Sequence, residues 1–286
     1  MSDIVIHALA SAAYAGLAWH FWNTRWRSAS PASHDAPAGL AGWERVALAA
    51  ALALHGGLLA NDILLAPELR FGFAQALSIT LWLAVAFYWI ESLFVRLDGF
   101  EPLLLPLAAV VAPLPALFPG LASPGISSAL EFKLHLLLAM CAYSLFTLAI
   151  LHAALMAFVE RRLHRLRPAS GESASLIAGP LSHLPPLLTL ERLLFRLIGA
   201  AFVFLTLTLA TGIVFSETLF GRAMRFDHKT VFAVLSWITF GALLTGRLLY
   251  GWRGRTALRW TLTGFVLLIL AYVGSRFVLE VILGRS

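Results

Sequence analysis

Residues 130–158 read LEFKLHLLLAMCAYSLFTLAILHAALMAF, and this stretch decides the fold class. After Lys133 the chain carries no Asp, Glu, Lys or Arg until Glu160. A helix that crosses a lipid bilayer needs roughly 20 predominantly apolar residues. The stretch therefore predicts a transmembrane helix that is long enough to tilt strongly or to project from the membrane.

The whole chain shares this composition. Of its 286 residues 60% are hydrophobic and only 13% are charged, whereas an ordinary soluble domain has about 25% charged residues. A soluble globule with so few charges would expose apolar patches that aggregate, which excludes soluble enzymes and disordered chains. Cys141 is the single cysteine, so internal disulfides and cysteine-based metal clusters within one chain are excluded. We expect an all-α, polytopic integral membrane protein.

Apolar windows along the chain predict about eight transmembrane helices. We expect them at Ile4–Trp22, Trp43–Ala60, Phe73–Phe94, Glu101–Phe118, Leu130–Phe158, Leu193–Phe215, Thr230–Tyr250 and Ala257–Leu283. They divide the chain into an N-terminal four-helix half, residues 1–128, and a C-terminal four-helix half, residues 129–286. Together the two halves form one membrane domain.

The distribution of basic residues predicts the orientation. No Lys or Arg precedes the first apolar run, which is unlike a secretory signal, while Arg25 and Arg27 follow it. Roughly twice as many Lys and Arg residues fall on one side of the membrane as on the other, and the richer side is cytoplasmic by the positive-inside rule. These arginines are read as anchors to anionic lipid headgroups, not as a nucleic-acid surface. With eight spans, both termini are extracytoplasmic.

Two predicted spans contain residues that are unusual in membrane helices. The fourth should be kinked or shortened, because proline removes a backbone donor and clashes with the preceding turn. Its prolines are Pro102, Pro106, Pro113 and Pro115. In the last span Arg276 and Glu280 lie four residues apart, a spacing that predicts an ion pair along the helix.

Histidines are costly within lipid, so they are the first candidates for a site. The predicted spans place His7, His55, His135 and His228 in the outer half, and His20, His152, His164 and His183 in the cytoplasmic half or loops. Neutral imidazole is an axial ligand of haem iron, and helical bundles build such sites from facing helices. The alternative is that each histidine hydrogen-bonds across a helix interface or contacts headgroups. The residues alone leave both interpretations open.

The outer loop before the seventh span reads Phe226-Asp227-His228-Lys229-Thr230. We expect Asp227 to cap the following helix, because a carboxylate at the N-terminus accepts a backbone N–H and suits the helix dipole. Lys229, with Arg222 and Arg225, can pair with ligand carboxylates such as haem propionates.

Several short motifs follow one another in the C-terminal half. His135 is followed after seven residues by Tyr143-Ser144. The later motifs are Leu190–Gly199, Phe204–Thr206, Thr211-Gly212, Asp227–Thr230, Trp237, Gly251–Gly254, Gly264-Phe265 and Tyr272–Gly274. In this order, from about Leu134 to Val278, they resemble the cytochrome c assembly family of haem-handling membrane proteins, the CcsA/ResC and CcmC-like proteins.

The resemblance is to the short, eight-span members of that family, which lack the tryptophan-rich outer loop of the full synthases. It implies a multi-pass protein of the bacterial plasma (inner) membrane that binds non-covalent, b-type haem near the extracytoplasmic face. Of the family's histidines the resemblance carries over only His135; depth adds His55, and position near the family's haem-presenting loop adds His228. The expected cofactor-binding residues are His135, His55, His228, Asp227 and Trp237. His135 and His55 are the expected metal ligands, and the choice of His55 or His228 as the second one is open.

The chain departs from the synthases where they bind and process haem. Residues 226–230 replace Trp-Asp-Pro-Lys-Glu, Thr245 replaces a histidine, and the final outer histidine has no counterpart before Ser286. We therefore expect no enzyme activity. The first hypothesis is a protein that assists haem delivery or cytochrome maturation, with lipid, haem and maturation proteins as partners. The alternative is a non-catalytic accessory subunit that keeps the fold without a cofactor and packs against a partner such as a transporter.

Overall fold

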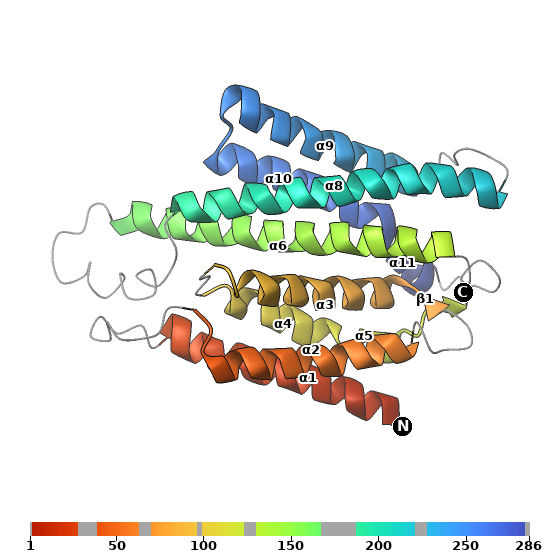
Figure 1. The fold of residues 1–286 in the computed structure, drawn as a ribbon, viewed down its shortest axis with the longest axis horizontal. Helices are drawn as coiled ribbons and strands as arrows, with labels where there is room; N and C mark the ends of the chain where they lie inside the picture. Colours follow the sequence, from red (N-terminus) through yellow and green to blue (C-terminus); the bar gives the residue numbers. More distant parts are fainter. Residues whose placement is uncertain are drawn as a thin grey trace.

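The computed structural model describes residues 2–27, 39–62, 70–95, 99–122, 130–166, 187–220 and 228–283. Long helices run side by side in one bundle, as Figure 1 shows, with α6 between the N-terminal and C-terminal helices. The strands β1 (Arg70–Phe71) and β2 (Leu121–Ala122) pair antiparallel, Phe71 opposite Leu121. The all-α, polytopic class is confirmed, with this two-residue ladder as its one addition in the described part.

The helices follow the predicted apolar windows. The N-terminal half contains α1 (Ser2–Phe21) with a π-helical extension (Trp22–Arg27), α2 (Gly42–Ala60), α3 (Phe73–Glu91), α4 (Glu101–Val111) and α5 (Leu114–Leu117). The C-terminal half contains α6 (Leu130–Leu166), α8 (Leu187–Phe220), α9 (His228–Tyr250), α10 (Gly254–Ile269), π-helical turns at Leu270–Gly274 and Val278–Ile282, and α11 (Ser275–Phe277) between them. At 37 residues α6 is the long helix that its sequence predicts.

Six of the described helices are long and apolar enough to cross a membrane. They are Ile4–Arg27, Phe73–Glu91, Glu131–Arg161, Leu187–Phe215, His228–Tyr250 and Gly254–Ile282. The two other predicted spans are also helices, but α2 carries Glu44 and Arg45 in its first turn, and α4 is short. A count of eight spans therefore stays a prediction.

The fourth predicted span is broken, as its prolines require. Pro106 lies inside α4, which ends at Val111. A turn at Ala112 and Pro113 follows, and α5 begins at Leu114. Each proline removes one backbone donor, so the helix cannot continue unchanged through this segment.

Helix α1 and the C-terminal segment define one end of the bundle. In Figure 1 α1 begins and the C-terminal segment ends at this same end. We call it the outer end, because the sequence predicts both termini outside, and the opposite end the inner end. Which membrane face the outer end meets stays a prediction.

Packing joins the two halves through α3 and α6. On one side α1 packs against α2 and α4, and α3 contacts α6. On the other side α6, α8, α9 and α10 form a ring in which each helix contacts the next. The boundary between residues 128 and 129 stays a prediction, and the halves serve below as descriptive units.

A buried acid at the inner end connects three N-terminal segments. Glu44 accepts hydrogen bonds from the Ala41 N–H at 2.7 Å and from Arg25 Nη2 at 3.0 Å. Its other carboxylate oxygen lies 2.9 Å from His20 Nε2. A buried charge is tolerated only when it is paired and hydrogen-bonded, and these contacts satisfy that condition for Glu44.

Candidate functional site

The outer end of the C-terminal ring has no fully buried side chains, although some of its apolar side chains, such as Phe132 and Leu136, pack against the core. None of residues 131–139 of α6, 206–215 of α8, 228–235 of α9 or 274–283 is buried. Further inward these helices bury Met140, Leu205, Ser236 and Val273. We call the four unburied stretches the outer mouth.

The N-terminal half, in contrast, has buried side chains at the outer end. There His7, His55, Leu58 and Phe73 are all buried. A binding site for a large ligand at the outer end is therefore favoured in the C-terminal half.

His135 lies in the outer mouth with one nitrogen fixed. Its Nδ1 is 3.0 Å from Thr211 Oγ1. The Thr211 hydroxyl lies within hydrogen-bond distance of the carbonyl oxygens of Leu207 and Thr208 as donor, which favours the tautomer in which its oxygen accepts from His135 Nδ1–H. In a neutral ring Nε2 then holds a lone pair. The ring also has a hydrogen-bond contact with the Thr208 backbone, so both of its partners lie on α8.

Gly212 makes the close approach of α8 to His135 possible. A Cβ at this position would lie 3.3 Å from His135 Cε1, which is tighter than ordinary van der Waals contact. The sequence shows the pair Thr211-Gly212 only as a motif. It does not reveal that the pair supplies the acceptor and the space beside His135, because sequence spacing does not show which helix faces α6.

Trp237 connects α9 with α8. Its Nε1–H donates to Thr206 Oγ1 at 2.9 Å, and its ring stacks on Phe202 at 5.7 Å between centroids. Trp237 lies just inside the outer mouth and uses the same kind of acceptor as His135, a threonine on α8. Its predicted contact with a cofactor stays a prediction.

His228 is exposed as the first residue of α9, at the outer end. Asp227, the predicted helix cap, lies outside the described residues, as do Arg222 and Arg225. The next residue, Lys229, is partly buried, and its Nζ lies 5.9 Å from the centroid of the Tyr272 ring.

Arg276 approaches the same Tyr272 ring, with its Cζ 5.8 Å from the centroid. Its predicted ion pair with Glu280 is present at 3.9 Å. Two cations, Lys229 and Arg276, therefore approach one aromatic ring at the outer mouth. One acid, Glu280, accompanies them.

His55 lies in a different environment from His135. It is 0% exposed, and its Nε2 is 2.8 Å from Ser78 Oγ of α3. The Tyr14 ring of α1 meets it edge-on at 5.7 Å. Its Nδ1 has no hydrogen-bond partner among the described residues. The contacts of His55 are thus with α1 and α3, and those of His135 with α8, so the structure does not bring the two rings together.

His7 of α1 makes further polar contacts nearer the outer end, one of them with Asp62 just after α2. His7 Nδ1 donates to the Ala112 carbonyl at 2.9 Å, and its Nε2 lies 3.7 Å from Asp62. His7 precedes Tyr14 by seven residues and Asp62 follows His55 by seven, which is the spacing of two antiparallel helices in register. The sequence interpretation missed Ser78, Tyr14 and Asp62.

Two of the family-like motif residues, Tyr143 and Gly264, have structural roles in the C-terminal ring. Tyr143 donates to the Leu268 carbonyl at 2.6 Å, and Ser236 donates to the Gly264 carbonyl at 2.9 Å. A Cβ on Gly264 would lie 2.8 Å from the Phe240 ring. These contacts place α10 against α6 and α9 and give the motifs a shared structural role.

Comparison with known proteins agrees with this architecture. Residues 43–283 match the family model described as cytochrome C assembly protein. The chain is 36% identical over 226 residues to the "Uncharacterized 28.8 kDa protein in nifR3-like 5'region" of Azospirillum brasilense, covering 73% of this chain and 76% of that protein.

Two further relatives match shorter parts. The inner membrane protein YpjD of Escherichia coli K12 is 32% identical over 148 residues, 52% of each chain. The cytochrome c biogenesis protein CcsA of Nostoc punctiforme is 34% identical over 86 residues, 30% of this chain and 24% of that protein. No solved structure matches. The chain therefore belongs to the cytochrome c assembly protein family, as a multi-pass protein of the bacterial inner membrane.

Proposed function

We propose that the protein binds haem at the outer mouth, with His135 Nε2 as an axial ligand, and assists haem delivery or cytochrome maturation. One observation supports this most directly: His135 Nδ1 lies 3.0 Å from Thr211 Oγ1 on α8, which leaves Nε2 as the ring nitrogen that a metal would use. A histidine that ligates a metal normally donates its other ring N–H to a fixed acceptor, which sets the tautomer and the ring orientation. Thr211 is such an acceptor.

The surroundings of His135 suit a large, flat, apolar group. The outer mouth has no fully buried residue in any of its four stretches, and the apolar side chains there that pack against the core, such as Phe132 and Leu136, are only partly buried. A macrocycle there would displace partly buried side chains and not the tightly packed interior. Bound haem would supply an iron centre able to accept imidazole and to change oxidation state. The chain's own residues would hold and orient it.

His228 is the better candidate for the second axial ligand. It is exposed at the start of α9 and at the outer end. His55 is completely enclosed, and one of its nitrogens already contacts Ser78. Ligation by His55 would require α1, α2 and α3 to separate.

Lys229 and Arg276 are candidates for the propionate contacts. Both approach the Tyr272 ring at the outer mouth. Haem propionates are carboxylates, and charge-assisted hydrogen bonds to Lys or Arg are the strong contacts for such groups. Because Glu280 pairs with Arg276, a propionate would share or displace that partner.

The family supports a role in handling haem and gives no reason to assign a bond-forming step. One relative is named a cytochrome c biogenesis protein, and we carry that role to this chain as part of the proposal. Thr245 stands where the synthases have a histidine, and the motif at residues 226–230 differs from theirs. Assistance without covalent chemistry is the function these residues support.

Haem titration of the protein purified in mild detergent tests the proposal. We expect a Soret band that saturates at one haem per chain, is lost in His135→Ala and persists in His183→Ala, a histidine from the predicted inner loop. Free imidazole should restore the band in His135→Gly, which separates loss of a ligand from loss of the fold. A wild-type protein without a Soret band after haem addition would overturn the proposal, and so would a full band in His135→Ala.

A further inference from the structure

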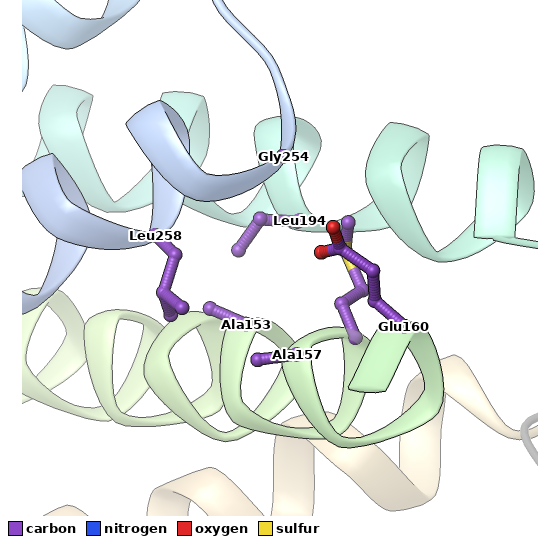
Figure 2. Close-up of a pocket in the computed structure, with 7 residues that line it drawn as sticks. Ala153, Ala157, Glu160, Leu194, Gly254 and Leu258 are labelled. Carbon is purple, nitrogen blue, oxygen red and sulfur yellow. The ribbon is translucent and has the colours of Figure 1, made fainter. Parts of the chain in front are cut away.

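A small hollow lies at the inner end of the C-terminal ring, between α6, α8 and α10 (Figure 2). Its volume is about 20 Å³. The lining residues are Ala153, Met156, Ala157, Leu194, Leu258 and Glu160, with Gly254 at the start of α10. In Figure 2 the Glu160 carboxylate stands at the side of the hollow, near Leu194. One acid thus faces a wall that is otherwise apolar.

The size and charge of the hollow indicate what fits. A volume of roughly 10–15 Å³ holds one water-sized group, so there is room for a primary ammonium but not for a trimethylated one. A carboxylate against an apolar wall favours a cation that also donates hydrogen bonds. An ammonium group meets both requirements.

Arg255 stands next to the hollow and is available for an anion. Its Nε is 3.8 Å from Glu160 Oε1, too far for a hydrogen bond, and its side chain is 76% exposed against 34% for Glu160. Pairs this exposed contribute little to stability and separate easily. Arg255 therefore has the freedom to turn toward a phosphate, which guanidinium binds well.

We propose that this hollow binds the headgroup of an ethanolamine phospholipid, with the ammonium at Glu160 and the phosphate at Arg255. The positive and the negative group of the lipid then each face a protein side chain of opposite charge. The position suits a lipid, because Glu160 lies at the inner end of a membrane-spanning helix whose next residue is Arg161. An anionic glycerol lipid would use Arg255 but would bring no cation to Glu160. A choline lipid carries the cation but has no N–H to donate.

Native mass spectrometry of the detergent-purified protein tests this assignment. The probes are phosphatidylethanolamine, phosphatidylcholine and phosphatidylglycerol with identical acyl chains. We expect the ethanolamine lipid to bind about tenfold more tightly than the others, the effect of one charge-assisted hydrogen bond. Glu160→Gln should abolish this preference, and Ala157→Leu, which fills the hollow, should do the same.

Glu131→Gln is the matched control, since it removes an exposed acid from the other end of α6, and it should keep the preference. Arg255→Ala should weaken the binding of all three lipids, because each carries the phosphate that Arg255 would contact. Equal retention of the three lipids by the wild type would overturn the proposal. Retention of the preference by Glu160→Gln would overturn it as well. Neither result depends on whether haem binds at the opposite end.

Discussion

His135 Nδ1 lies 3.0 Å from Thr211 Oγ1, and the Thr211 hydroxyl is itself committed to the Leu207 carbonyl at 2.8 Å. The oxygen is therefore a fixed acceptor on α8, and it holds the imidazole of α6 in one tautomer. This relationship converts a histidine at the edge of a membrane helix into an oriented ligand with Nε2 unprotonated.

Thr211→Val removes that acceptor and leaves the side-chain volume nearly unchanged. We expect haem affinity, measured by titration of the Soret band, to fall about 10- to 100-fold, as is typical when the partner of a metal-binding histidine is removed. Thr239→Val is the control, because Thr239 donates to the Leu235 carbonyl of its own helix. Wild-type affinity in Thr211→Val, or an equal loss in Thr239→Val, would argue against the role of Thr211.

The sequence predicts where the helices lie along the chain, but it does not predict which side of each helix faces which neighbour. Apolar run length is a property of each segment by itself, so the stretch from Leu130 predicts one long helix, and α6 is that helix. Depth also follows from run length, and it predicts His55 and His135 near the same outer level. Which neighbour a side chain meets depends on rotation about the helix axis and on packing between distant segments. His55 therefore contacts Ser78 and Tyr14, while His135 contacts Thr211.

Tyr14→Phe should stabilise the protein. The Tyr14 hydroxyl is completely buried and has no hydrogen-bond partner among the described residues. An unsatisfied buried polar group costs about 1–3 kcal/mol, so its removal should raise the midpoint of thermal unfolding in detergent. Tyr143→Phe should have the opposite effect, because the Tyr143 hydroxyl donates to the Leu268 carbonyl. The midpoint of thermal unfolding of this variant should fall. A lower midpoint in Tyr14→Phe would show that its hydroxyl has a partner.

Gly264→Ala should destabilise the C-terminal ring. The added Cβ would lie 2.8 Å from the Phe240 ring, and Phe240 is held by stacking on Phe146 at 3.8 Å between centroids. Overpacking of this kind costs about 1–3 kcal/mol. Gly199→Ala is the matched control, since a Cβ added there would meet nothing within 4 Å, and alanine is the better helix former. Equal unfolding midpoints for the two variants would contradict this account of Gly264.

Glu44→Gln should destabilise the inner end far more than Glu160→Gln does. Glu44 is 4% exposed and accepts from Arg25 and from the Ala41 N–H. An amide oxygen could still accept from both of these donors, which share one carboxylate oxygen, but the lost negative charge would leave the Arg25 cation without its ion-pair partner, at a cost of about 3 kcal/mol or more. The pair of Glu160 with Arg255 is long and exposed, and the loss of that one pair is expected to cost about 0–1 kcal/mol. Thermal unfolding of both variants in the same detergent measures the difference. A large loss in Glu160→Gln would mean that its carboxylate stabilises the fold and does not primarily bind a headgroup.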